Sequence, residues 1–163
     1  MRKLNERLQA IVRYIEKGER VADIGTDHAL LPVYLVRNGI SPLVIATDVA
    51  AGPFAVARGR IDTLMDGSEG AERIILRRGD GLEALEPGEV DAVIIAGMGG
   101  ELIADIITRD TGKGRSFAKY ILQPRTKADR LRVSLAENGF IIREETAALE
   151  RGRVCEVLVA GPG

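Results

Sequence analysis

Short, continuous apolar runs alternate with longer segments of helical periodicity along most of the chain, and this alternation is the feature that most constrains the fold. Five runs have the length of buried strands: Val21–Ile24, Leu43–Thr47, Ile74–Leu76, Ala92–Ala96 and Tyr120–Leu122. Four segments carry apolar residues at helical spacing: Leu30–Asn38, Pro53–Leu64, Leu102–Thr108 and Lys127–Asn138. Uninterrupted apolar strands separated by helices are typical of a parallel sheet covered on both faces. The sequence therefore predicts a doubly wound α/β layer.

The two ends of the chain depart from this alternation. Residues 4–17 have the spacing of an amphipathic helix that Gly18 ends. Near the other end, Phe140–Glu145 and Val154–Val159 read as strands joined by a short polar turn around residues 150–153. That connection is too short for a helical crossover, so we expect an antiparallel final pair with Cys155 facing the core. Residues 112–114 read as a flexible loop.

Composition excludes several classes of protein. The chain has 163 residues, of which 45% are hydrophobic and 29% charged, as expected for one folded domain of ordinary size and not for a disordered chain. One cysteine and one histidine rule out a disulfide framework and a structural zinc site, and we predict no metal. No run approaches the roughly 20 apolar residues of a membrane span, and the charged N-terminus is unlike a signal peptide. The expected location is the cytoplasm.

Acidic residues and glycines follow successive strands, where an open α/β sheet binds its ligands. The first strand contains Asp23 and leads into Gly25 and Thr26, without the G-x-G-x-x-G of dinucleotide-binding proteins. The second ends at Asp48, a residue type suited to accept hydrogen bonds from both hydroxyls of a ribose. Each of these segments is also compatible with an ordinary turn.

The third and fourth strands continue the series. Asp80 and Gly81 follow the third strand, where a carboxylate could accept a hydrogen bond from the amine of an adenine. Ala96, Gly97 and Met98 end the fourth in a stretch of small residues around one thioether. An acid for a ribose, an acid for an adenine and glycine turns at consecutive strand ends predict an S-adenosylmethionine pocket in a class I methyltransferase with a Rossmann-like, mostly parallel seven-stranded sheet and a C-terminal antiparallel hairpin.

The words DIGTDHALLP, ATDVAAGP, GDGL, AGMGG and ILQP, in this order, closely resemble the TrmK family of bacterial tRNA (adenine-22-N1)-methyltransferases. The resemblance implies S-adenosyl-L-methionine as cofactor and tRNA as partner, with no protein partner. The cofactor residues that it implies are Asp23, Gly25, Thr26, Asp48, Asp80, Gly81, Ala96, Gly97 and Met98. This sequence departs from the family in having Arg125 after ILQP, and in ending at Gly163 without the family's C-terminal helical extension. We therefore expect residues 1–163 to form a single catalytic domain.

The expected reaction needs alignment more than a strong base. Neutral adenine has a lone pair at N1 and no proton there, so it attacks the sulfonium methyl group directly. We expect three catalytic residues. Asp27 and His28 are placed at the rim of the pocket, facing the acceptor base, and Met98 at its floor. Several basic clusters, including Arg125, Lys127, Arg130 and Arg132, are candidates for phosphate contact or simply solvated faces.

Three other functions compete with this one. A non-catalytic module that binds S-adenosylmethionine or RNA would leave tRNA unlabelled when offered a labelled methyl donor. A nicotinamide oxidoreductase is disfavoured by the missing glycine fingerprint. A methyltransferase with another acceptor remains the third alternative, and mapping the methylated nucleotide would distinguish it.

Overall fold

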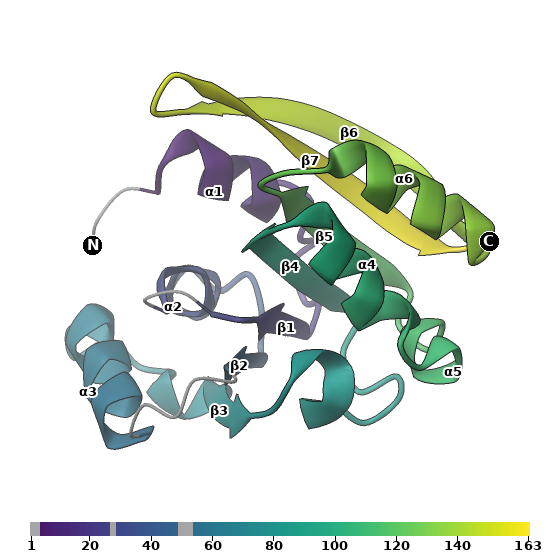
Figure 1. Cartoon of the computed structure of the whole chain (residues 1–163). Helices are drawn as coiled ribbons and strands as arrows, with labels where there is room; N and C mark the ends of the chain where they lie inside the picture. The colour runs from purple at the N-terminus through teal and green to yellow at the C-terminus, as the bar shows by residue number, and fades with distance from the viewer. Residues whose placement is uncertain (1–3, 27–28, 49–53) are drawn as a thin grey trace.

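The protein is described by a computed structural model that covers residues 4–26, 29–48 and 54–163. Within these residues seven strands form one sheet in the order β3-β2-β1-β4-β5-β7-β6 (Figure 1). The strands are β1 Val21–Ile24, β2 Val44–Asp48, β3 Ile74–Arg78, β4 Ala92–Met98, β5 Lys119–Pro124, β6 Phe140–Glu150 and β7 Arg153–Pro162. Strands β1 to β5 run parallel, and β7 is antiparallel to both of its neighbours. The predicted fold class is confirmed, including the closing hairpin.

Helices cover both faces of the sheet, which accounts for the mostly apolar residues of its central strands. One core lies under α1 Glu6–Val12, α2 Leu30–Arg37 and α3 Phe54–Met65. The other lies under α4 Gly100–Thr108, α6 Ala128–Glu137 and the 3-10 helix η2 Gly81–Ala84. Two short elements complete the chain, η1 Ala71–Arg73 and α5 Thr111–Gly114. None of the helices in the described ranges is long and apolar enough to cross a bilayer.

The first helix is shorter than its apolar periodicity predicts. It ends at Val12, and the chain continues in tight turns in which the amide of Ile15 donates to the carbonyl of Val12 at 2.9 Å. The Lys119 ammonium group donates to the carbonyl of Tyr14 at 2.7 Å. Ile15 remains buried within this turn, so its place in the apolar pattern reflects burial and not helix.

Two further expectations from the sequence are wrong. Residues 112–114 are not a loop, because the Asp110 carboxylate caps the amide of Lys113 and the buried Tyr120 hydroxyl donates to the Gly114 carbonyl, making α5. Cys155 is only partly buried. The hairpin extends well past β5, which pairs only with residues 158–160 of β7, so Cys155 lies beyond the shared core.

A prediction about acid stability follows from the edge of the sheet. The Arg77 guanidinium donates two 2.7 Å hydrogen bonds to the Glu89 carboxylate, and these hold the pKa of Glu89 below its ordinary 4.5. A depressed folded-state pKa gives stability that is present above pH 4.5 and is lost as the pH falls through the folded value.

We therefore expect Arg77→Met to lower the free energy of unfolding by about 1 kcal/mol at pH 7 and by progressively less toward pH 3. Urea denaturation at several pH values measures the effect. Arg78→Met removes the same charge from an exposed position of the same strand and serves as control. A loss that is equal for both variants, or constant with pH, would contradict the assignment.

Candidate functional site

The sheet changes direction between β1 and β4, and the predicted site residues gather at the carboxyl edge there. From β1 the chain winds outward through β2 and β3, and then returns to the other side of β1 with β4. In register, Ile24 lies between Thr47 of β2 and Ile95 of β4. The segments that follow these strands therefore emerge side by side at the switch point, where open α/β sheets form their ligand crevice.

The segment after β1 makes the closest contact with the end of β4. Gly25 has a φ of +70°, and a Cβ atom there would lie 2.5 Å from the Met98 methyl carbon. The amide of Thr26 donates to the carbonyl of Thr47 at 2.9 Å, which holds this segment against β2. Asp23 is buried on β1, two residues before Gly25. Glycine at position 25 therefore permits both the positive φ of the turn and the close approach of the Met98 methyl group.

Buried hydroxyl groups point to a polar ligand at this edge. Among the described residues, three side-chain hydroxyl oxygens are buried without a hydrogen-bond partner, those of Thr26, Ser41 and Thr47, and the Oγ1 atoms of Thr26 and Thr47 lie at this edge. Leaving a buried hydroxyl unsatisfied is unfavourable, so such groups call for an explanation. Both belong to consecutive strand ends at the switch point. Thr47 was not selected from the sequence; its signal is a polar residue near the end of an apolar strand.

The ends of β2 and β3 bring two carboxylates to the same edge. Asp48 ends β2, and its carbonyl accepts from the amide of Gly79, 3.2 Å away in the segment after β3. This bond places Asp80 beside β2. The Asp80 carboxylate is 56% exposed and lies 3.1 Å from the Arg109 guanidinium at the end of α4. Hydrogen bonding to Asp105 is the main cause that raises the pKa of Arg109, and Asp80 adds to it.

Glycines at this edge permit close packing. Gly81 has a φ of +59°, and a Cβ atom there would lie 3.1 Å from a methyl group of Ile106. The segment after β3 is thereby seated on α4.

Strand β4 ends in a bulge that opens toward the crevice. Its pairing with β5 shifts between Ala96 and Met98, so Gly97 is the extra residue. Gly97 has a φ of +76°, and no described atom lies within 4 Å of where its Cβ would be. A side chain at this position would be strained by the backbone and not by lack of space. The bulge thus turns Met98 toward Gly25.

Sequence reasoning missed the residue that holds this bulge. Gln123 of β5 is buried, and its side-chain oxygen accepts from the amide of Gly97 at 3.1 Å and from Arg7 Nη1 at 3.2 Å. Its signal in the sequence is one polar residue inside a strand that is otherwise apolar.

Two of the three predicted catalytic residues, Asp27 and His28, lie outside the described residues. The structure places their neighbours at the switch point, since Thr26 is bonded to β2 and Ala29 precedes α2. The N-cap of α2 is Ala29, which has a left-handed conformation. In the ranges that the structure describes, no group of three acidic, histidine or cysteine side chains could hold a metal ion.

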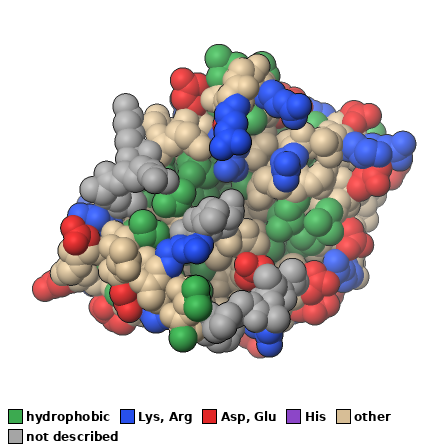
Figure 2. Space-filling view, turned by 60° about the vertical axis from the view of Figure 1, so that its left-hand side comes forward, with side chains coloured by type: hydrophobic (Ala, Val, Ile, Leu, Met, Phe, Trp, Pro, Cys, Tyr) green, Lys and Arg blue, Asp and Glu red, His purple; other side chains and the backbone are tan. Residues whose placement is uncertain are grey.

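Three of the four candidates for phosphate contact that were named after the fifth strand are engaged in ion pairs. Arg132 binds Glu145 and Glu156, Lys127 and Arg130 both approach Glu101, and these pairs lie on the surface. Figure 2 accordingly shows basic and acidic side chains interspersed on one face of the molecule. Arg125 is exposed, and its amide donates to the Met98 carbonyl at 2.8 Å, which places it at the rim of the crevice.

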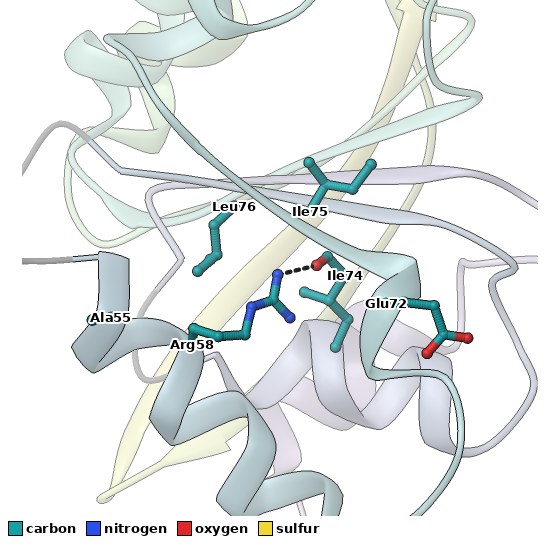
Figure 3. A pocket seen from close by; sticks show the side chains of 6 residues that line it. All are labelled: Ala55, Arg58, Glu72, Ile74, Ile75 and Leu76. Atoms are coloured by element: carbon teal, nitrogen blue, oxygen red, sulfur yellow. Dashed lines mark hydrogen bonds between the residues drawn. The ribbon is translucent and has the colours of Figure 1, made fainter.

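A separate hollow lies between α3 and β3, away from the carboxyl edge. It is lined by Ala55, Arg58, Glu72, Ile74, Ile75 and Leu76 (Figure 3). The Arg58 guanidinium crosses it and donates to the carbonyls of Ala71 and Ile74 at 3.1 and 2.7 Å. Of these two carbonyls, that of Ile74 belongs to the edge strand β3, so Arg58 occupies one backbone acceptor of that strand.

Comparison with known proteins gives consistent results. Residues 4–158 match the family described as a methyltransferase domain. The chain is 40% identical over 161 residues to the Bacillus subtilis (strain 168) protein named tRNA (adenine(22)-N(1))-methyltransferase, covering 99% of this chain and 66% of that protein. It thus spans just under two thirds of that relative's length.

Two solved structures resemble the fold closely. The crystal structure of the B. subtilis tRNA methyltransferase TrmK has a TM-score of 0.87 and 40% identity, with 99% of this chain and 67% of that chain covered. A Streptococcus pneumoniae protein solved in complex with S-adenosyl-L-methionine has a TM-score of 0.86 and 36% identity, with 96% and 72% covered.

Proposed function

This chain belongs to the TrmK family of class I methyltransferases, and from that premise we propose that it transfers a methyl group from S-adenosyl-L-methionine to N1 of adenine 22 in tRNA. The observation that carries the proposal is the row of predicted residues at the switch point. Asp23 with Gly25, Asp48, Asp80, and Gly97 with Met98 stand at the ends of four strands on one edge of the sheet. The proposal treats the chain as a single catalytic domain that acts on tRNA in the cytoplasm.

The side chains at this edge fit the cofactor. We assign Asp48 to the ribose hydroxyls, and Asp80 with Gly81 to the adenine. The amino-acid end belongs over Asp23, Gly25 and Thr26, where the Thr26 hydroxyl is buried without a partner. Ala96, Gly97 and Met98 form the floor on which methyl donor and acceptor meet. The Asp80 carboxylate, which now pairs with Arg109, is 56% exposed. The adenine amine can therefore reach it and replace Arg109 as its partner.

Methyl transfer requires the protein to align the reactants and to exclude water. The bound cofactor supplies an electrophilic methyl group on a positively charged sulfur. The protein must bring N1 into line with that methyl group and exclude water from the crevice. Adenine must also leave its stack in the tRNA, at a cost of a few kcal/mol. Arg125, at the rim, is suitably placed to meet a phosphate of the incoming strand.

The proposed roles of Asp27 and His28 predict a separation of catalysis from cofactor binding. His28→Ala and Asp27→Ala are each expected to lower kcat by about 100-fold, because they orient the acceptor base and not the cofactor. The dissociation constant for S-adenosylmethionine should change by no more than about 3-fold. Steady-state transfer to tRNA measures kcat, and calorimetry measures the dissociation constant. If both variants keep the wild-type kcat and KM for tRNA, the roles are wrong.

Transfer of a labelled methyl group to bulk tRNA tests the function itself. The expected result is one labelled product, 1-methyladenosine at position 22, found by mapping a nuclease digest. Label at another nucleotide would indicate a different acceptor. Binding of S-adenosylmethionine without any labelled product would favour a non-catalytic binding module.

A further inference from the structure

One hydrogen-bond network reaches from the floor of the crevice to the tip of the β6–β7 hairpin, and it contains no residue selected as a site residue from the sequence except Gly97. Gln123 stands at its centre, 2% exposed, at the carboxyl end of β5. Its side-chain oxygen accepts from the Gly97 amide at 3.1 Å and from Arg7 Nη1 at 3.2 Å. Its amide nitrogen donates to the Pro124 carbonyl at 3.0 Å. Both ends of the side chain are therefore satisfied, which fixes its orientation.

Arg7 links this glutamine to two other parts of the fold. It projects from α1, and its Nε atom forms an ion pair with Glu150 at the end of β6. Neighbouring Glu6 accepts from the amide of Leu149 at 3.3 Å, so α1 holds the hairpin at two consecutive residues. The Arg7 and Glu150 side chains are only 20% and 27% exposed. An ion pair that is partly withdrawn from water is more strongly coupled than one on the open surface.

At the crevice floor the network ends at the backbone amide of Gly97. Gly97 has no side chain to anchor it, and its φ of +76° lies in a region open mainly to glycine. The Gln123 oxygen is its amide's partner across the bulge. The next residue, Met98, has its methyl carbon against Gly25. The position of the crevice floor therefore depends on the position of the Gln123 side chain.

We propose that Gln123, oriented by Arg7, is a positioning residue that fixes the Gly97–Met98 floor on which the methyl group and its acceptor are aligned. Its effect on catalysis rests on the proposed function, whereas its effect on the floor does not. A glutamine is required because one oxygen must accept from two donors while the nitrogen serves Pro124. Leucine would fill much of the volume and leave the Gly97 amide without a partner.

Three variants and two measurements test the proposal. Gln123→Leu removes the acceptor, and Gln123→Glu restores an oxygen acceptor without the donor to Pro124. Tyr120→Phe is the matched control, since it removes a buried side-chain hydrogen bond to the Gly114 carbonyl, 2.6 Å long, from the same strand. Tyr120 belongs to the core under α4 and α6, on the face away from α1.

The first measurement follows the floor directly. The chain contains only three methionines, so methyl-labelled methionine gives a simple NMR spectrum. We expect Gln123→Leu to shift or broaden the Met98 methyl signal in the protein without cofactor, and Gln123→Glu to do so less. Met65, the last residue of α3 and 1% exposed, should keep its signal and acts as internal reference. Tyr120→Phe should leave the Met98 signal in place.

The second measurement follows transfer. Gln123→Leu should lower kcat by about 10-fold to 100-fold with an unchanged KM for tRNA, Gln123→Glu should recover part of the rate, and Tyr120→Phe should stay within about 2-fold of wild type. An unmoved Met98 signal, or a kcat for Gln123→Leu no lower than that of Tyr120→Phe, overturns the proposal. If the wild-type protein transfers no methyl group to tRNA, the proposed function fails, and the Met98 signal alone then decides the role of Gln123.

Discussion

Replacing Asp48 with alanine is expected to weaken binding of S-adenosylmethionine by at least about 100-fold, because the carboxylate is assigned to accept from both ribose hydroxyls. Hydrogen bonds to a charged group contribute about 1.5–3 kcal/mol each, and two of them correspond to roughly 100-fold to 10,000-fold in affinity. Asp48 ends β2 and is partly buried at the crevice edge. In the alanine variant, water can therefore only partly replace the lost hydrogen bonds to the ribose. Isothermal titration calorimetry measures the dissociation constant directly.

The controls for this prediction separate charge from position. Asp48→Asn keeps one acceptor and loses the charge, so we expect an affinity between those of wild type and Asp48→Ala. Asp62→Ala removes the same charge from an exposed position in α3 and should leave the affinity unchanged. An Asp48→Ala protein that folds normally and binds S-adenosylmethionine like wild type would remove Asp48 from the site.

Adding a single methyl group at Gly100 is expected to destabilise the protein by about 2–3 kcal/mol, at the upper end of what overpacking costs. Helix α4 begins there, against the segment that follows β5. A Cβ atom at Gly100 would lie 2.2 Å from the Lys127 carbonyl oxygen and 3.0 Å from that of Thr126. Both are backbone atoms, and the Gly100 amide is bonded to Thr126 at 2.7 Å, so neither side can move away independently. Gly100→Ala should lower the Tm by roughly 5–10 °C.

Another glycine provides a control with the opposite sign. Gly59 lies in α3, and no described atom lies within 4 Å of where its Cβ would be. Gly59→Ala should raise stability by about 0.5–1 kcal/mol, because alanine loses less backbone entropy in a helix than glycine. Urea denaturation of the two variants side by side is the measurement. Equal effects of the two substitutions would show that the close approach at Gly100 is not what limits stability.

The candidate site was predictable from the sequence as far as its residues follow strands. Asp48 was identified because it comes directly after an apolar run, and Asp80 because it comes four residues after the end of the next one, while parallel strands end at one edge of a sheet. The side chains that contact these carboxylates were not predictable. The Asp80 carboxylate lies 3.1 Å from the guanidinium of Arg109, at the C-terminal end of α4. No local pattern in the sequence links these two residues.

The errors in element boundaries also involve side chains outside the misread segments. The apolar spacing of residues 4–17 is that of a helix, yet α1 ends at Val12, and the Tyr14 carbonyl accepts from Lys119 of β5, 105 residues away. Residues 112–114 read as a loop from their two glycines, but the Asp110 cap and the Tyr120 hydroxyl hold them in a helical turn. These two bonds span only three and six residues, but their side chains lie outside the glycine segment from which the loop was predicted.

The sequence by itself determined the order and type of the seven strands and the longer helices, the closing hairpin and the chemical character of each strand end, because these depend on periodicity and turn chemistry within short windows. Only the tertiary structure decided the bulge at Gly97, the seat of Met98 on Gly25 and the network through Gln123. Arg7 and Gln123 are 116 residues apart, and Arg7 and Glu150 are 143 apart. Such pairs form only when sheet order and register have brought α1, β5 and the hairpin together, and no local pattern in the chain records that geometry.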